Sequence, residues 1–138
     1  MDLGLLGTID CTRYTAMIID DIPINTKLLS KLLEYSKLNL VQFNNSVLAW
    51  EKLPSVKPDL ILLDVMMPGM NGLEFLEKVR ADHAWDATRV IMVSAVSEAE
   101  EISKAQALGS NDYITKPINA KKLFASVATQ LMSIEKKD

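Results

Sequence analysis

Short apolar runs alternate along the chain with longer segments in which apolar residues recur every three or four positions. The continuous runs predict strands at 16–19, 40–43, 59–63, 90–93 and 113–115. The spaced residues, such as Ile24, Leu28 and Leu32, share one helical face and predict helices at 24–35, 46–52, 72–80, 97–108 and 119–132. We expect Ser46 to cap the second helix and Pro54 to stop it, because proline cannot donate the helical hydrogen bond.

Strict alternation of strand and helix is typical of an α/β protein built on a parallel sheet. We therefore predict a doubly wound five-stranded parallel sheet with helices on both faces, in the flavodoxin-like strand order 2-1-3-4-5. In this order the first and third strands are neighbours, and the strand order reverses between them. Their carboxyl ends should line the crevice in which such folds bind ligands.

The composition is that of an ordinary globular domain. The chain has 138 residues, of which 49% are hydrophobic and 24% charged, and its formal net charge is -3. This length suits one domain, and neither a membrane span nor direct nucleic-acid binding is indicated. The single cysteine, Cys11, excludes an internal disulfide and favours a reducing compartment, which we take to be the cytoplasm.

The two ends of the chain lie outside the alternating pattern. Residues 1–13 lack the basic and long apolar segments of a signal peptide. We treat them as a leader, for which disorder, a linker or cloning residue are the open explanations. Residues 14–133 form the predicted domain, and residues 134–138 form a short polar tail.

Polar side chains stand at the carboxyl ends of four predicted strands. Asp20 and Asp21 follow the first strand, and Asp64 follows the third. Ser94 closes the fourth and Lys116 follows the fifth, so the predicted sheet gathers these side chains at one edge. Three acids in one crevice repel each other, and oxygen ligands without His or Cys suit Mg²⁺, with Mn²⁺ as an alternative. A carboxylate beside a cation and a lysine can attack a phosphoryl group, which makes Asp64 the candidate nucleophile.

Each of these residues alone has an ordinary structural explanation. Asp21 could cap the following helix, Asp64 could begin a turn, and Tyr113 could be an aromatic on an edge strand. Their conjunction at four strand ends favours a functional site. Phosphatases with an aspartyl nucleophile usually place a second Asp two positions later, where this chain has Met66. Nucleotide binding is disfavoured because the chain has no glycine-rich phosphate loop.

Four motifs occur in the order and spacing of one protein family. They read IIDD at 18–21, LLDVMMPGMNG at 62–72, VSA at 93–95 and YITKP at 113–117. Asp64 precedes Ser94 by 30 positions and Lys116 by 52. Together these motifs resemble the receiver domains of two-component response regulators, over roughly residues 15–132. The resemblance implies a CheY-like fold.

The resemblance also implies roles for the site residues. Asp64 is similar to the phosphoacceptor of the family, and Asp20 and Asp21 are similar to its Mg²⁺-binding acids. Asp64 and the backbone carbonyl of Met66 would complete the metal ligands. Lys116 is similar to the basic partner of the phosphoryl group.

Three residues resemble the parts of the family's conformational switch. Ser94 is similar to the hydroxyl that follows the phosphoryl group, and Pro117 would follow a cis peptide bond. Tyr113 is similar to the aromatic residue that turns inward and reshapes the surface of the fourth helix, fifth strand and fifth helix. Met66 and Val96 occupy the positions that influence hydrolysis in this family. Neither side chain can orient a water, so we expect self-dephosphorylation to take minutes or longer.

The function implied is a signalling switch, not an enzyme, apart from Mg²⁺-dependent self-phosphorylation and self-dephosphorylation. The implied partners are a histidine kinase or histidine phosphotransfer protein, and a downstream protein or output domain, with a homodimer also open. No contact with nucleic acid or membrane is expected. The chain could be free-standing or belong to a larger regulator or hybrid kinase. The alternative is a pseudo-receiver that binds a protein without phosphorylation, against which the intact acids, hydroxyl and lysine argue.

Overall fold

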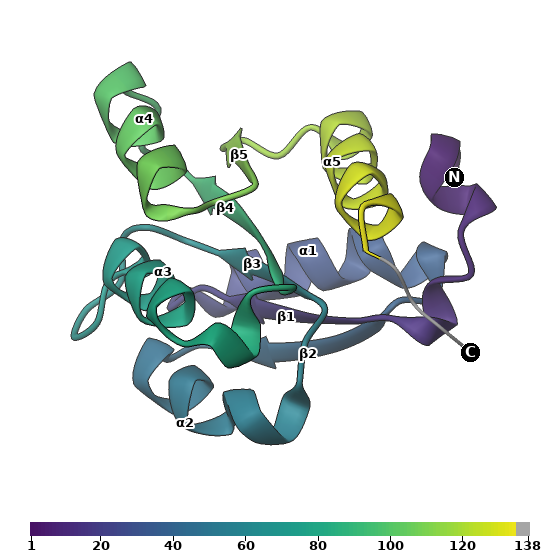
Figure 1. The fold of residues 1–138 in the computed structure, drawn as a ribbon. Coiled ribbons are helices and arrows are strands. Elements are labelled where there is room, and N and C mark those ends of the chain that lie inside the picture. The colour runs from purple at the N-terminus through teal and green to yellow at the C-terminus, as the bar shows by residue number, and fades with distance from the viewer. Residues whose placement is uncertain (135–138) are drawn as a thin grey trace.

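The computed structural model describes residues 1–134, and within them parallel strands form a five-stranded sheet (Figure 1). The strand order is β2-β1-β3-β4-β5, as predicted. The strands are β1 (Thr15–Ile19), β2 (Asn39–Phe43), β3 (Leu60–Leu63), β4 (Arg89–Ser94) and β5 (Asp112–Thr115). β1 and β3 pair directly, with Ile19 opposite Leu63 at their carboxyl ends. The doubly wound parallel fold is therefore confirmed.

Helices cover both faces of the sheet. They are α1 (Pro23–Leu33), α2 (Ser46–Val56), α3 (Gly72–Ala81), α4 (Ala99–Leu108) and α5 (Ala120–Met132). Side chains of the strands alternate between two apolar cores, as the pleat of a strand requires. Ala16 and Ile18 belong to the core that contains α1 and α5, whereas Met17 and Ile19 belong to the core that contains α2, α3 and α4. Figure 1 shows these helices on either side of the sheet.

The residue that caps α2 differs from the prediction. Asn45 is the N-cap, and its side-chain oxygen accepts a hydrogen bond from the N–H of Leu48 at 2.9 Å. The hydroxyl of Ser46 instead donates to the backbone carbonyl of Met70 at 2.5 Å. Ser46 therefore ties α2 to the loop before α3, and the expectation that it caps the helix is wrong.

The end of α2 also differs from the prediction. The helix continues through Pro54 to Val56, and the N–H of Lys57 still donates to the carbonyl of Leu53 at 2.9 Å. Pro54 removes only its own donor, and it lies on the exposed side of the helix within one turn of the end. The backbone carbonyl that loses its helical donor is thus close to solvent, and the helix can tolerate the proline.

The segment before β1 is folded in this structure. Gly4–Thr8 and Cys11–Arg13 form short 3-10 helices, as do Glu34–Ser36 and His83–Trp85. The first of these packs on α5 (Figure 1). The side chain of Leu6 in this segment is fully buried. At the other end, residues 135–138 of the predicted tail lie outside the described residues. Among residues 1–134, every helix is too short or too polar to cross a membrane.

Candidate functional site

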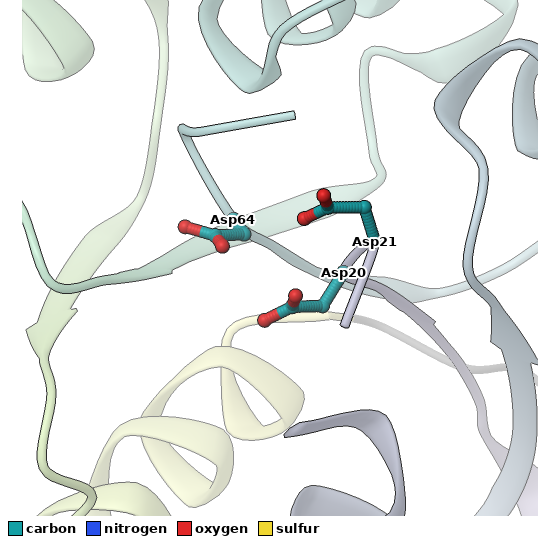
Figure 2. A group of neighbouring side chains, drawn as sticks. All are labelled: Asp20, Asp21 and Asp64. Atoms are coloured by element: carbon teal, nitrogen blue, oxygen red, sulfur yellow. The ribbon is translucent and has the colours of Figure 1, made fainter. Parts of the chain in front are cut away.

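Three carboxylates converge at the carboxyl edge of the sheet. Asp20 and Asp21 follow β1, Asp64 follows β3, and one oxygen of each lies within 4.8 Å of the others (Figure 2). The N–H of Asp64 donates to the carbonyl of Ile19 at 3.0 Å, so pairing between the strands continues into the acidic segments. Asp20 and Asp64 are only 2% and 5% exposed, whereas Asp21 is partly buried. The structure thus brings together the acids that the sequence places at this edge.

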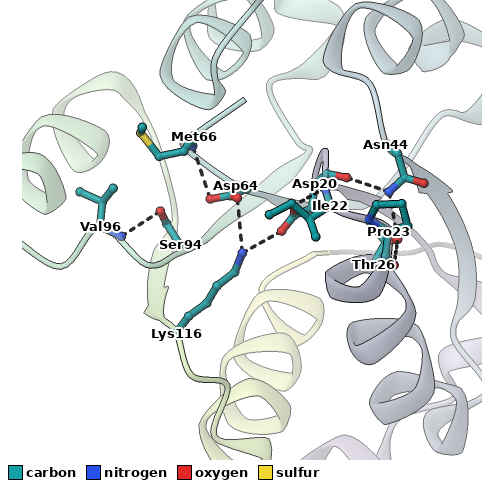
Figure 3. A network of polar contacts seen from close by, with 10 residues as sticks. All are labelled: Asp20, Ile22, Pro23, Thr26, Asn44, Asp64, Met66, Ser94, Val96 and Lys116. Atoms are coloured by element: carbon teal, nitrogen blue, oxygen red, sulfur yellow. Dashed lines mark hydrogen bonds and ion pairs between the residues drawn. The ribbon is translucent and has the colours of Figure 1, made fainter. Parts of the chain in front are cut away.

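Lys116 reaches the acids from the loop after β5. Its Nζ lies 2.8 Å from Oδ2 of Asp20 and 3.3 Å from Oδ2 of Asp64 (Figure 3). The backbone N–H of Lys116 donates to the carbonyl of Ser94 at 2.9 Å, which continues the pairing of β4 and β5 beyond the strands. The Lys116–Pro117 peptide bond is cis, as the resemblance implies. Sheet pairing therefore sets the position from which the ammonium group contacts both acids.

The charges of this cluster are not balanced by Lys116 alone. Burial raises the pKa of the Asp64 carboxyl; the charge of Lys116 opposes the rise, and the charge of Asp20 adds to it. Burial by itself would lower the pKa of Lys116, but the hydrogen bond to Asp20 and the charge of Asp64 outweigh it and leave this pKa raised. The ionised form of Asp64 is thus disfavoured at this position, and additional positive charge would stabilise it.

The acids fit a hard divalent cation. Oδ1 of Asp21 is buried and has no hydrogen-bond partner among residues 1–134. A buried carboxylate oxygen without a partner is unfavourable, and coordination to a cation would satisfy it. Oxygen donors without nearby sulfur or imidazole are the ligands that Mg²⁺ and Mn²⁺ prefer. The donor set therefore suits the ions that the sequence predicts.

A glycine holds the following loop against Asp64. A Cβ atom on Gly72 would lie 1.9 Å from the backbone oxygen of Asp64, so a larger residue does not fit there. The N–H of Gly72 also donates to the carbonyl of Val65 at 2.9 Å. Within this loop, the N–H of Met66 approaches Oδ1 of Asp64 at 3.4 Å, while Met66 as a whole is 65% exposed. The backbone of Met66 therefore lies beside the acids, and its side chain faces solvent.

Ser94 connects Asp64 to the loop before α4. Ser94 is fully buried, and its Oγ accepts a hydrogen bond from the N–H of Val96 at 3.1 Å (Figure 3). The hydroxyl of Tyr113 donates to the carbonyl of Val96 at 2.6 Å. Burial raises the pKa of Tyr113, and a hydrogen bond with Ser94 opposes the rise; the hydroxyl of Ser94 likewise opposes the raised pKa of Asp64. One polar network therefore extends from Asp64 to β5.

The structure also tests the ordinary explanations of these residues. The N-cap of α1 is Ile22, so Asp21 does not cap this helix. Tyr113 is anchored through its hydroxyl, which packing on an edge strand would not require. Asn44 was not among the predicted site residues, although its Nδ2 donates to the backbone carbonyl of Asp20 at 2.8 Å. The only signal for Asn44 was its place directly after the second predicted strand, at the same edge of the sheet.

A family model described as the response regulator receiver domain matches residues 16–128. The chain belongs to this family. The match includes β1 to β5 almost entirely, and with them the acids, Ser94, Tyr113 and Lys116. The folded N-terminal segment with Leu6 precedes the matched part of the receiver domain.

Two relatives of this receiver domain are longer proteins. The chain is 39% identical over 111 residues to the protein-glutamate methylesterase/protein-glutamine glutaminase of Trichodesmium erythraeum. This alignment covers 78% of this chain and 31% of that protein. It is 31% identical over 117 residues to the phosphate regulon transcriptional regulatory protein PhoB of Pseudomonas aeruginosa, covering 85% of this chain and 51% of that protein. The chain therefore spans about half or less of the length of these relatives.

Solved receiver domains share the fold over most of the chain. The signal receiver domain of a DNA binding response regulator from Colwellia psychrerythraea superposes with a TM-score of 0.82 at 25% identity, covering 87% of this chain and 99% of that chain. A two-component response regulator from Clostridium difficile gives a TM-score of 0.80 at 27% identity, with 87% and 97% covered. The CheY-like fold is therefore confirmed.

Proposed function

We propose that this receiver domain is a phosphorylation-operated switch of a two-component pathway, with Asp64 as the residue that accepts the phosphoryl group. The observation that carries the proposal is the position of the Asp64 carboxylate beside both Lys116 and the two acids after β1. Its Oδ2 lies 3.3 Å from Nζ of Lys116, and oxygens of Asp20 and Asp21 lie within 4.8 Å. A carboxylate can act as a nucleophile toward phosphorus when positive charge shields the transferred oxygens.

In the proposed transfer, a carboxylate oxygen of Asp64 attacks the phosphorus of a phosphohistidine on a histidine kinase or histidine phosphotransfer protein. The P–O bond forms as the P–N bond breaks, and the electron pair of that bond returns to the imidazole, which takes up a proton. Lys116 neutralises part of the charge on the transferred oxygens, and the hydroxyl of Ser94 donates to one of them. Self-phosphorylation with a small phosphodonor would use the same residues.

We assign the Mg²⁺ site to Asp20, Asp21, Asp64 and the backbone carbonyl of Met66, with Mn²⁺ as a substitute. The unpartnered Oδ1 of Asp21 supports this assignment. When bound, the cation supplies the positive charge that the acids and the transferred phosphoryl oxygens require. The pairing of β1 with β3 holds the carboxylates in place for the cation and for the phosphoryl group.

The proposed output begins at Ser94. Its hydroxyl accepts from the N–H of Val96, whose carbonyl is held by Tyr113. If the hydroxyl turned toward a phosphoryl group on Asp64, it would release Val96 and allow the loop before α4 to move, and Tyr113 would follow. α4 suits such a movement because Ala105 is its only buried residue. We therefore place the signalling surface on α4, β5 and α5, adjoining the loop of the cis peptide bond.

An exposed apolar surface beside the site suits contact with a phosphodonor protein. Ile22, Ile24 and Leu28 are 49%, 72% and 46% exposed, although each is a large apolar residue. Leu28 also lines a pocket with Lys116 and Pro117. Apolar residues grouped on a surface commonly mark a protein contact. This surface would bring a phosphohistidine close to Asp64.

The setting of the switch is part of the proposal. We place the chain in the cytoplasm, where a reducing environment would keep the buried Cys11 a free thiol. The signal would pass to a downstream protein, to an output domain of a longer chain, or to a second receiver in a homodimer. All three would contact the surface of α4, β5 and α5.

Labelling of the purified protein with a small phosphodonor and Mg²⁺ tests this proposal. Wild type should acquire a phosphoryl group, Asp64→Asn should not, and Asp86→Asn should behave as wild type because Asp86 is exposed and remote from the acid cluster. Beryllofluoride, a phosphoryl analogue, should change the NMR signals of Tyr113. Equal labelling of wild type and Asp64→Asn would contradict the assignment of Asp64. No labelling of either would favour a pseudo-receiver that binds a partner without phosphorylation.

A further inference from the structure

The side chain of Asn44 holds the loop that carries the first two acids of the site. Its Nδ2 donates one hydrogen bond to the backbone carbonyl of Asp20 at 2.8 Å and another to Oγ1 of Thr26 at 3.1 Å (Figure 3). Asp20 is 2% exposed and Thr26 is 1% exposed, so both acceptors belong to buried residues. Asn44 therefore links the end of β2 to the loop between β1 and α1 and to the first turn of α1.

The amide of Asn44 takes the place of a missing backbone donor. The pairing of β1 with β2 ends at Ile19 and Phe43, and the N–H of Asp20 still donates to the carbonyl of Phe43 at 3.2 Å. In a parallel ladder, the carbonyl of Asp20 would next accept from the N–H of residue 45. Asn45 has instead turned away to cap α2. The side chain of Asn44 thus adds one hydrogen bond to Asp20 beyond the last backbone pairing of β1 with β2.

This hydrogen bond also sets the direction of Asp21. The carbonyl of Asp20 and the N–H of Asp21 belong to one planar peptide unit, so fixing the carbonyl fixes the position of the next Cα atom. At the start of α1, the N–H of Ile22 donates to Oδ1 of Asp20 at 3.0 Å, which holds the Asp20 side chain, whereas the side chain of Ile22 does not cap the helix. The second hydrogen bond of Asn44 restrains the first turn of α1, because its acceptor Thr26 donates its own hydroxyl to the carbonyl of Pro23 at 2.9 Å.

We propose that Asn44 is a positioning residue for the divalent cation: it acts through the backbone of Asp20 to place the carboxylates of Asp20 and Asp21. The inference rests on the proposed function, since it assumes that these acids bind a cation. Residues that orient metal ligands commonly change metal affinity by about 10-fold to 100-fold when they are removed. Asn44 does not touch the cation site itself, so its effect should appear in affinity without a change in the ligand set.

Binding of Mn²⁺ to the purified protein, measured by electron paramagnetic resonance of the free ion, tests the inference directly. Asn44→Ala should weaken binding about 10-fold. Asn45→Ala is the matched control: it changes the neighbouring exposed asparagine and removes the cap of α2, but it leaves the loop of the acids untouched. Its affinity should stay within about twofold of wild type. Competition with Mg²⁺ and loss of binding in Asp21→Asn would show that the measured ion occupies the acid cluster.

Thr26→Val provides a second variant that keeps the shape of the buried side chain and removes its hydroxyl, which accepts from Asn44 and donates to the carbonyl of Pro23. Its affinity for Mn²⁺ should fall between those of wild type and Asn44→Ala. If Asn44→Ala does not fold, Thr26→Val tests the inference in its place. Wild-type affinity in the folded Asn44→Ala or, failing that, in Thr26→Val would overturn the inference and leave the proposed function intact. Equal weakening in Asn45→Ala would also overturn it. Absence of binding to wild type would overturn the proposed metal site as well.

Discussion

The substitution Asp64→Asn should make the receiver domain more stable when divalent cations are removed. Carboxylate oxygens of Asp20, Asp21 and Asp64 lie within 4.8 Å of one another, and Asp64 lies 3.3 Å from Lys116. With an effective dielectric constant of about 20, each like-charge pair at that separation costs about 3.5 kcal/mol, and the pair with Lys116 returns about 5 kcal/mol. Neutralising Asp64 relieves two repulsions and loses one attraction, so the free energy of unfolding should rise by about 2 kcal/mol.

The pH dependence of this difference follows from the raised pKa of Asp64. Burial raises that pKa, so the folded protein keeps the proton of Asp64 to a higher pH than the unfolded chain. Asp64 therefore lowers stability as the pH rises from its unfolded pKa through its folded pKa. The advantage of Asp64→Asn should grow as the pH rises through that window and shrink as the pH falls through it.

Urea unfolding at pH 7 in EDTA measures this difference in the free energy of unfolding. The control Asp86→Asn removes a charge from a side chain that is 62% exposed, and should change stability by less than about 0.5 kcal/mol. Adding Mg²⁺ should stabilise wild type more than Asp64→Asn, because the variant lacks a proposed ligand. An Asp64→Asn protein that is no more stable than wild type in EDTA would refute the electrostatic argument.

Three further predictions concern the loop, the N-terminal segment and the proposed chemistry. Gly72→Ala should lower the free energy of unfolding by about 3 kcal/mol, because its methyl group would lie 1.9 Å from a backbone oxygen; a loss below about 1 kcal/mol in urea would contradict this fit. Leu6→Ala should cost about 2–5 kcal/mol because Leu6 is 0% exposed, whereas Leu5→Ala, at a residue 62% exposed, should cost less than about 0.5 kcal/mol; equal effects in thermal melts would argue against docking of this segment. Phosphorylated protein should keep its label for minutes or longer, since neither Met66 nor Val96 can orient a water, and loss within seconds after removal of the donor would disprove it.

The position of the acids could be predicted because it depends on strand order and little else. Apolar runs and helical spacing identify the elements, and right-handed crossovers restrict the order in which strands lie side by side. A polar residue directly after a buried strand must emerge at the carboxyl edge, which places Asp20 and Asp64 there. The pairing of Ile19 with Leu63 then makes the two acids neighbours. Lys116 follows by the same reasoning from the last strand.

Contacts that depend on the exact ends of elements could not be predicted. Leu6 lies in a 3-10 helix of five residues, which is too short to show a periodic pattern. Ser46 has the side chain of a cap, but it is the first residue of the helix, and Asn45 before it is the cap. The role of Asn44 depends on the same turn, because its amide reaches Asp20 only where the backbone of β2 has left the ladder.

Burial of the central strand explains how the receiver domain tolerates its own acid cluster. All four residues of β3, Leu60–Leu63, are buried, and each large apolar side chain contributes about 1.5–3 kcal/mol when it leaves water. This contribution is comparable with the repulsion among three acids that Lys116 balances only in part, so the sheet can hold charges together that would otherwise separate. A cation that binds only the folded state relieves this repulsion and stabilises the fold by mass action. The electrostatic strain in the cation-free receiver is therefore the same free energy that favours binding of the cation beside Asp64.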